Sequence, residues 1–205
     1  PAPFDHDTTG FFYVTPIDLR RSKDQQAQHL SVHCTPGLSL AALHEGYPGH
    51  HLQASHAIRA ATRLRRLANS DVFAEGWAFY CEELMDEQGF FTLDPFTRLF
   101  RLRDQLWRAW RVVLDVGLQT GRIGVDEAVR TLADELMLPE VAAEAEVRRY
   151  VLTPTQPLAF LVGRLMILEL REEVRQAMGA RFDLGAFHAA LLASGTDKSQ
   201  VPQNP

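Results

Sequence analysis

The sequence is poor in three features that would each point to a particular class of protein. Its only cysteines, Cys34 and Cys81, have no CxxC spacing, so a disulfide framework is excluded and both are expected to be small core residues. No apolar run approaches the ~18 residues of a membrane helix, and no leader segment is visible. Acidic residues outnumber basic ones by 26 to 21, which argues against binding to nucleic acid. The compartment stays undetermined, although these absences favour the cytoplasm.

What the chain does contain is the composition of one globular domain with a helical pattern. Hydrophobic residues make up 46% and charged residues 23% of 205 residues, which is enough to bury a core. From residue 36 onward apolar residues recur every three to four positions, so we predict a single, mainly α-helical domain over residues 1–205. The expected helices cover residues 36–45, 49–68, 71–87, 94–119, 126–137, 139–150, 156–178 and 183–193.

The two ends of the chain have weaker patterns. The first 36 residues are expected to form loop and strand, and residues 10–16, GFFYVTP, favour one short strand or hairpin because they are aromatic and β-branched. Residues 194–205 are polar and contain proline, so we expect a frayed tail. Because the first residue is not methionine and the start resembles a loop, we expect a fragment of a longer protein.

Residues 43–53, LHEGYPGHHLQ, begin like the HExxH zinc-binding signature but place Gly-Tyr-Pro-Gly before the next histidine. In a regular helix His44 and His50 are six positions apart and point about 120° away from each other, so one metal ion would not reach both. Pro48 favours a break because it lacks an amide hydrogen, and the glycines on either side make a distortion inexpensive. A bulge or turn would then bring His50 round to face His44.

A catalytic zinc site needs further ligands and a base. His51 competes with His50 as the second ligand, because seven positions place it on the same helical face as His44, although ~10 Å further along a straight axis. We prefer His50. A catalytic zinc ion keeps three nitrogen or oxygen ligands and one open position. Glu75, within FAEGWAFYCEEL, is the expected third ligand, and Glu45 is the candidate general base.

The second helix of this site offers two more features. Glu82 follows Glu75 by seven residues on the same face and is expected to accept the free N–H of a histidine ligand. Gly76 permits close approach of a neighbouring helix. Spacing alone leaves an alternative open, in which the three histidines within eight residues line a polar turn and both glutamates lie on solvated helix faces.

Amide hydrolysis also needs a donor for the negative charge that develops on the carbonyl oxygen. Tyr150, just before a proline-marked break, is the first choice, with Tyr80 and Tyr47 as alternatives. The other interpretation of Tyr150 is a half-buried aromatic residue at a helix end. Arg111 is expected to pair with Asp115, four residues later, or to bind a substrate carboxylate.

The remaining polar side chains fall into two sets. One set is expected behind the ligands or at the substrate: His51, Glu82, Arg111 and Gln156. The other set belongs to the 94–119 helix and is expected mostly on solvated faces because it forms no narrow stripe: Arg98, Arg101, Arg103 and Arg108.

Four stretches of the sequence resemble a known family, and together they cover nearly the whole chain: HEGYPGHHLQ, EGWAFYCEEL, LWRAWRVVLDVGL and RYVLTPTQPLAFLVGRLMILELR. They resemble the bacterial domain of unknown function 885 family, in the C-terminal portion of its much longer proteins. Members are similar to all-helical zincin metallopeptidases related to the carboxypeptidase Taq group. The resemblance implies a zincin-like fold with one zinc ion on His44, His50 and Glu75, and Glu45 as base. Phe160 departs from the family pattern, which often has tyrosine there.

Three functions follow from these observations. The leading hypothesis is the C-terminal catalytic segment of a zinc-dependent metallopeptidase, which cuts a peptide or other amide bond and is weakly active or inactive as this fragment. The alternatives are a non-catalytic metal-binding or structural helical domain, and a helical interaction module that binds no metal. We expect no nucleic acid partner and no membrane span, and either a homodimer or pairing with a missing N-terminal lobe.

Overall fold

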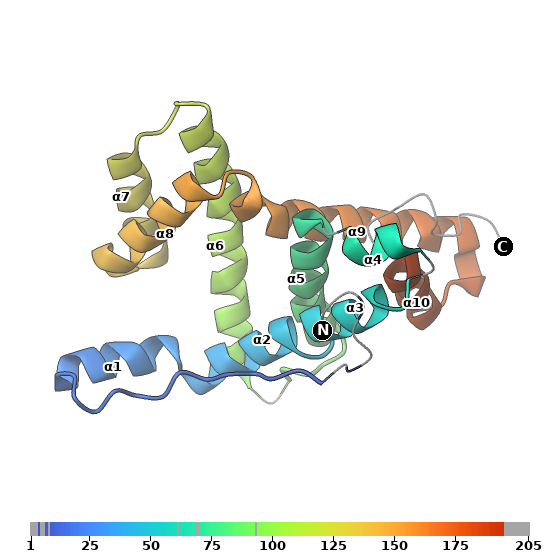
Figure 1. Ribbon diagram of the computed structural model, residues 1–205, viewed down its shortest axis with the longest axis horizontal. Coiled ribbons are helices and arrows are strands. Elements are labelled where there is room, and N and C mark those ends of the chain that lie inside the picture. Colours follow the sequence, from blue (N-terminus) through green and yellow to red (C-terminus); the bar gives the residue numbers. More distant parts are fainter. Residues whose placement is uncertain are drawn as a thin grey trace.

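The computed structural model describes residues 4, 7, 9–60, 62–68, 70–92 and 94–194 of the chain. This part is all-α and contains no strand, so the predicted fold class is confirmed at that level (Figure 1). A short 3₁₀ turn at Gly179–Arg181 joins the last two helices. The helices are α1 (Lys23–Val32), α2 (Thr35–Glu45), α3 (His50–Ala57), α4 (Arg63–Leu67), α5 (Asp71–Glu87), α6 (Pro95–Gln119), α7 (Val125–Leu136), α8 (Glu140–Leu152), α9 (Gln156–Met178) and α10 (Leu184–Ser194).

Most predicted helices are confirmed to within two residues at each end, because their boundaries carry local signals. At the start of α6 the Asp94 carboxylate accepts hydrogen bonds from the backbone N–H groups of Phe96 and Thr97, at 3.1 and 3.2 Å. Pro95 follows at the first helical position, where a missing amide hydrogen costs nothing. The 25-residue α6 therefore begins where its sequence predicts.

The prediction of one helix over residues 49–68 is wrong, because the structure divides this segment into α3 and α4. Between them the chain makes turns in which Arg59 N–H bonds to the carbonyl of His56. Thr62 then caps α4 by accepting a hydrogen bond from the backbone N–H of Arg65 at 3.2 Å. A capping side chain competes with helix continuation, and here it starts a new helix.

The prediction of a strand or hairpin at residues 10–16 is also wrong. Phe11 and Tyr13 are 75% and 84% exposed, and no backbone hydrogen bond joins residues 11–14 to any described part of the chain. Aromatic and β-branched composition favours a strand only where a neighbouring strand supplies partners for the backbone groups. The described chain supplies none.

Helix α1 forms within the first 36 residues, where loop and strand were expected. Ser22 accepts a hydrogen bond from the backbone N–H of Gln25, and the Gln25 side chain accepts one from the N–H of Ser22, which completes a capping box. The helix is mostly polar and has no apolar stripe, so apolar periodicity gives no signal for it. Its cap and its good helix formers are the local signals that were present.

Helices α5 and α9 cross at a contact between glycines. A Cβ atom on Gly76 would lie 2.5 Å from the backbone of Gly163, and one on Gly163 would lie 1.8 Å from the carbonyl oxygen of Val72. Only hydrogen atoms fit between the two backbones, which confirms that Gly76 permits close helix approach. This crossing places Glu75, the residue before Gly76, beside the start of α9.

Three apolar clusters hold the helices together. One cluster joins α5, α9 and α10, with Trp77, Tyr80 and Phe187 among its buried members. Another lies among α6, α7 and α8, and a small third cluster centres on Leu40 and Leu43 of α2. Figure 1 shows α7 and α8 near one end of the long α6 and α2 near its other end. Helix α6 thus separates α2 from the α7–α8 pair.

Helix α10 runs to Ser194, and the predicted frayed tail beyond that residue lies outside the described residues. Among the described helices, none is by itself long and apolar enough to cross a membrane. Helices α8 and α9 reach the length and apolar composition of a membrane span only when they are taken together, and the chain bends by 82° at the break between them.

Candidate metal centre

The turn between α2 and α3 has the break that the sequence predicts, at residues 46–49. Gly49 N–H bonds to the carbonyl of Leu43 at 3.0 Å, and a Cβ on Gly49 would lie 1.8 Å from the carbonyl oxygen of His44. Only glycine fits such a close approach. The Pro48 carbonyl accepts a hydrogen bond from Trp77 Nε1 at 2.9 Å, which fixes the turn to α5.

The turn brings two imidazoles together. The rings of His44, at the end of α2, and His50, at the start of α3, have centroids 4.8 Å apart and planes at 86° to each other. One donor atom from each of His44, Glu45 and His50 lies within 4.8 Å of the other two. His44 is buried, His50 half-buried and Glu45 exposed, so this group could hold a metal ion at the edge of the solvent.

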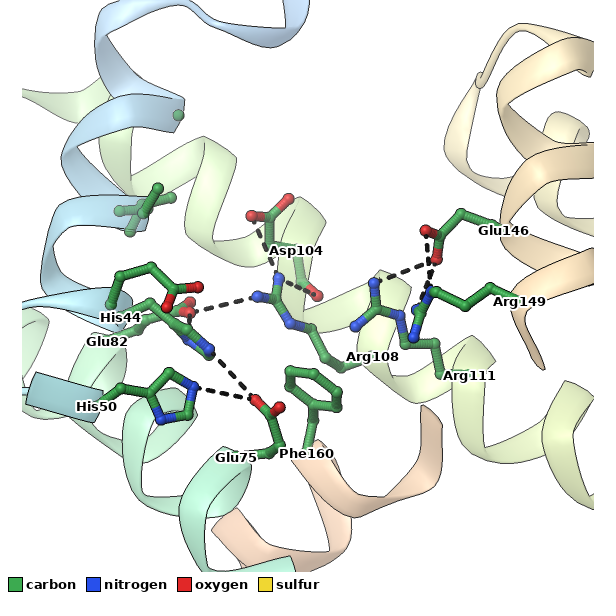
Figure 2. Close-up of a pocket in the computed structure, with 14 residues that line it drawn as sticks. His44, His50, Glu75, Glu82, Asp104, Arg108, Arg111, Glu146, Arg149 and Phe160 are labelled. Atoms are coloured by element: carbon green, nitrogen blue, oxygen red, sulfur yellow. Dashed lines mark hydrogen bonds and ion pairs between the residues drawn. The ribbon is translucent and has the colours of Figure 1, made fainter. Parts of the chain in front are cut away.

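Glu75 of α5 faces both imidazoles (Figure 2). Its Oε2 atom lies 3.5 Å from His44 Nε2 and 3.3 Å from His50 Nε2. Burial alone would raise the pKa of Glu75, but the hydrogen bonds from the two histidines lower that pKa to about 2. The Glu75 carboxylate is therefore negatively charged at neutral pH, and it faces the Nε2 atoms of both histidines.

Glu82 holds His44 from the other side. His44 Nδ1 lies 2.8 Å from Glu82 Oε1, and Glu82 is 1% exposed. Burial alone would lower the pKa of His44, but its hydrogen bonds to Glu75 and Glu82 raise it. A metal ion that replaced the proton on Nε2 would leave Nδ1–H donating to Glu82 and the Nε2 lone pair directed at the ion, on the side of Glu75.

These side chains line one end of a cavity of about 410 Å³. Arg108 lies in the middle, paired with Glu82 at 3.4 Å and with Asp104 at 3.2 Å. The far wall is formed by Arg111, Glu146 and Arg149 (Figure 2). Both of these arginines contact one oxygen, Glu146 Oε2, at 3.2 and 3.0 Å. The cavity therefore runs from the histidines of α2 and α3 to an arginine wall on α6 and α8.

Phe160 of α9 lies beneath this cavity. The guanidinium groups of Arg111 and Arg108 lie 4.9 and 5.8 Å from the centre of its ring. The His44 ring is roughly parallel to it, with centroids 6.1 Å apart. The phenyl ring thus supports the charged groups through its face, a contact that needs no hydroxyl group.

Three residues that the sequence predicts for the site lie outside this cavity. Tyr150 is fully buried among α6, α7 and α8, and its hydroxyl donates to Glu146 at 2.9 Å. Gln156 accepts a hydrogen bond from Arg149 at 2.7 Å. His51 packs its ring against Tyr47, with centroids 5.2 Å apart, and is not among the residues that line this cavity. Tyr150 and Gln156 reach the cavity only through the side chains that they hold.

Arg111 and Arg108 differ from their predicted surroundings. Arg111 pairs with Glu146 of α8, whereas Asp115 accepts a hydrogen bond from the backbone N–H of Thr155. Arg108 is largely shielded rather than solvated, with a side chain 14% exposed. Arg101 is buried and bonds to Asp86 at 2.7 Å. Acidic partners on other helices compensate the cost of burying both guanidinium groups.

Sequence reasoning missed four charged residues that line the cavity: Asp104, Arg108, Glu146 and Arg149. Asp104, Arg108 and Arg111 follow each other at intervals of four and three, so a shared face of α6 was a signal that could have grouped them. No comparable signal links this face to α8. That contact depends on how the α7–α8 pair folds back on α6.

Comparisons with known proteins place the chain in a family without assigning an activity. The family model described as "Bacterial protein of unknown function (DUF885)" matches residues 1–196. A solved structure described as "the putative lipoprotein from Colwellia psychrerythraea" is 37% identical, with a TM-score of 0.76 over 82% of this chain. A "putative lipoprotein of unknown function from Shewanella oneidensis" is 28% identical, with a TM-score of 0.84 over 99% of this chain.

No curated protein matches the chain. The chain spans 28% of the length of the Colwellia protein and 36% of the length of the Shewanella protein. The predicted resemblance is confirmed, both by the family model and by the structural matches to longer proteins. The chain belongs to the bacterial family of unknown function DUF885.

Proposed function

We propose that this chain is the zinc-binding part of a zincin-like metallopeptidase, with one zinc ion on His44, His50 and Glu75. One observation carries the proposal: Glu75 Oε2 lies 3.5 and 3.3 Å from the Nε2 atoms of the two histidines. Zinc bonds to nitrogen and carboxylate oxygen are ~2.0–2.2 Å long, so a tetrahedral ion separates neighbouring ligand atoms by about 3.3–3.5 Å. Both separations from Glu75 fit that geometry, and three protein ligands would leave a fourth position of the ion open.

A ligand set of His44, Glu45 and His50 is the alternative, since their donor atoms also lie close together. We prefer Glu75 because both of its contacts fall within the range expected between ligands of one tetrahedral ion. Glu45 then remains available as a base. Glu82, which accepts the Nδ1–H of His44, orients that ring and keeps its Nε2 free for the metal.

The side chains around the ion suit hydrolysis of an amide. Bound zinc would supply Lewis-acid activation of a water molecule. Glu45 lines the cavity and would take the proton of that water and deliver it to the leaving nitrogen. Arg108 and Arg111 also line the cavity and would stabilise negative charge on the substrate carbonyl oxygen.

Tyr150 was predicted to stabilise that charge, and its hydroxyl lies within hydrogen-bond reach of two side chains of the arginine wall. Its oxygen is 2.9 Å from Glu146 Oε2 and 3.4 Å from Arg111 Nε. We propose that Tyr150 positions Arg111, and that Arg111 meets the substrate. Gln156 does the same for Arg149.

A non-catalytic metal-binding domain is the second candidate. The observation that favours it is length, since this chain spans about a third of its two structural relatives. The rest of such a protein would have to supply another wall of the site. In that case the 205-residue chain binds zinc but turns over little or no peptide.

The first experiment measures metal. Elemental mass spectrometry of the purified chain should find about one zinc ion per chain, and His44→Ala and Glu75→Ala should lose it. Glu45→Gln should retain zinc and lose any hydrolysis of a fluorogenic peptide library. The matched controls are His56→Ala on α3 and Glu87→Ala on α5, which lie outside the cavity and should keep the metal.

The results separate the candidates. Zinc that persists in Glu75→Ala but is lost in Glu45→Gln would favour the alternative ligand set. Hydrolysis that is lost in Glu45→Gln would support the peptidase, whereas zinc in a wild-type chain without hydrolysis would fit both the non-catalytic domain and a catalytic segment that needs the rest of a longer protein. A folded wild-type chain that takes up no zinc would reject both.

A further inference from the structure

A second cavity, of about 650 Å³, adjoins the candidate metal centre. Residues 10–13 form one side of it, and Glu45, Gly46, Tyr47 and His51 form the other. Glu45 lines both cavities. The candidate base therefore stands between the arginine-walled cavity and this second one.

The walls of the two cavities differ in chemistry. The first cavity is lined by carboxylates and arginines, whereas the second is lined by the aromatic side chains of Phe11, Phe12, Tyr13 and Tyr47. Aromatic walls favour an apolar side chain, because its burial removes apolar surface from water on both partners. The volume lies within the usual range of ligand pockets and accommodates an aromatic ring.

The main chain on the outer side of this cavity is open to partners. No backbone hydrogen bond joins residues 11–14 to any described part of the chain, so within that part their N–H and C=O groups have no main-chain partner. Unpaired backbone of this kind is the surface to which an extended peptide adds as a strand. Residues 10–16 also have the aromatic composition of a strand, which suits pairing with an extended peptide.

The open segment is held at both ends. Gly10 packs so closely on the His51 ring that a Cβ on Gly10 would lie 2.6 Å from His51 Nδ1. At the other end His29 Nε2, on α1, lies 3.2 Å from the carbonyl oxygen of Thr15. Residues 11–14 therefore lie between two fixed contacts, at Gly10 and Thr15, and residues 11–13 line the same cavity as Glu45.

We propose that an extended peptide pairs with the backbone of residues 11–14 and inserts an apolar side chain, of the phenylalanine class, into the second cavity. That residue lies next to the amide bond that faces Glu45. This names the substrate class of the proposed peptidase and rests on that function for the position of the cleaved bond. Peptide binding itself requires neither zinc nor turnover.

The test uses two fluorescein-labelled heptapeptides of alanine that differ only at the central residue, phenylalanine or aspartate. Fluorescence anisotropy with the 205-residue chain should show at least tenfold tighter binding of the phenylalanine peptide, with or without zinc. Phe11→Ala and Tyr47→Ala should reduce this preference to less than threefold. Phe96→Ala is the matched control, because Phe96 is about as exposed as Phe11 but lies at the start of α6.

A third probe tests the backbone contact. The phenylalanine peptide with methyl groups on the two amides that flank the central residue loses those donors, and we expect its affinity to fall at least tenfold. Equal binding of the phenylalanine and aspartate peptides, an unchanged preference in Phe11→Ala, or undiminished binding of the methylated peptide would each overturn the inference. Circular dichroism of each variant checks that its helices remain.

The same data separate this inference from the proposed function. If the phenylalanine peptide binds selectively but the folded chain takes up no zinc, the proposed function fails and the peptide site stands. If peptides are hydrolysed with no preference for an apolar residue near the cut, the peptidase stands and the inference falls.

Discussion

Glu82 is the buried carboxylate on which the geometry around His44 depends. One of its oxygens contacts His44 Nδ1 at 2.8 Å and Arg108 at 3.4 Å, and its other oxygen has no partner among the described residues. Burying such a group is costly unless its partners compensate. The cost is offset here by one imidazole and one guanidinium. At the residue scale, this is the contact that decides which nitrogen of His44 faces Glu75.

Glu82→Gln should therefore weaken zinc binding without removing a ligand. Loss of such a supporting carboxylate typically costs about 10–100-fold in metal affinity. Competition with a zinc-chelating dye measures this change. Glu83→Gln is the matched control, since Glu83 is the next residue of α5 but pairs with Arg164. An unchanged affinity in Glu82→Gln would show that His44 needs no such support.

At the scale of elements, the crossing of α5 and α9 sets the position of Glu75. Gly76 and Gly163 bring the two backbones into contact, and Trp77, the next residue, bonds to the carbonyl of Pro48 in the turn. One helix therefore touches both the floor of the site and the turn that carries His50. A displacement of α5 would separate all three proposed ligands.

Gly76→Ala should destabilise the fold and the metal site together. The added methyl group would meet the Gly163 backbone at 2.5 Å, and overpacking of this kind typically costs about 1–3 kcal/mol. Urea unfolding followed by circular dichroism, with a zinc titration, measures both effects. Gly124→Ala is the control, because nothing lies within 4 Å of its added Cβ and its φ is ordinary. Equal stability of the two variants would contradict the close crossing.

His188 links α10 to α5 and should make stability depend on pH. Its Nε2 lies 2.8 Å from the Tyr80 hydroxyl, and burial, with Arg171 nearby, lowers its pKa from 6.5 to about 4. Below pH 6.5 the unfolded chain binds a proton that the folded chain does not bind until about pH 4. The free energy of unfolding should therefore fall as the pH is lowered from 6.5 to 4.

Urea unfolding at pH 7 and pH 5 tests this dependence. His188→Gln removes the titrating group, so its loss of stability between these two pH values should be smaller than that of the wild type. Carboxylates elsewhere titrate in both proteins and cancel in the comparison. Equal losses would mean that His188 does not carry the effect.

At the scale of the whole molecule, α6 presents an apolar stripe that is exposed within the described part of the chain. Its members follow each other at intervals of three, four, seven and three residues and are between 42% and 61% exposed: Leu99, Leu102, Leu106, Val113 and Val116. Such a stripe normally packs against another helix. The chain spans about a third of its structural relatives, so we propose that this face pairs with the rest of a longer protein, or with a second copy when that part is missing.

The isolated 205-residue chain should therefore self-associate. Sedimentation velocity at increasing concentration should show species larger than the monomer of 23.1 kDa, and Leu99→Lys with Leu106→Lys should shift the population toward monomer. Leu64→Lys, an equally simple change at an exposed leucine of α4, serves as control and should leave association unchanged. A wild-type chain that stays monomeric at all concentrations would refute a role for this stripe in self-association.

The sequence by itself determined most of what depends on near neighbours. Apolar periodicity and caps such as Asp94 predicted most helices, and the glycines and Pro48 predicted the turn between His44 and His50. The errors have local causes as well. Residues 10–16 have a strand composition without a partner, and α1 has a capping box without an apolar stripe. Local rules also grouped His44, Glu45 and His50, because these residues share one turn.

Only the tertiary structure decided which distant side chains meet. Glu75 was one of several downstream glutamates, and its contact with both imidazoles depends on the crossing of α5 and α9 at Gly76 and Gly163. The burial of Arg108 and the wall formed with α8 likewise depend on packing between helices. These contacts join residues far apart in the chain, and their free energies come from burial and close packing. Spacing along one helix does not encode them, since each depends on a surface that another helix provides.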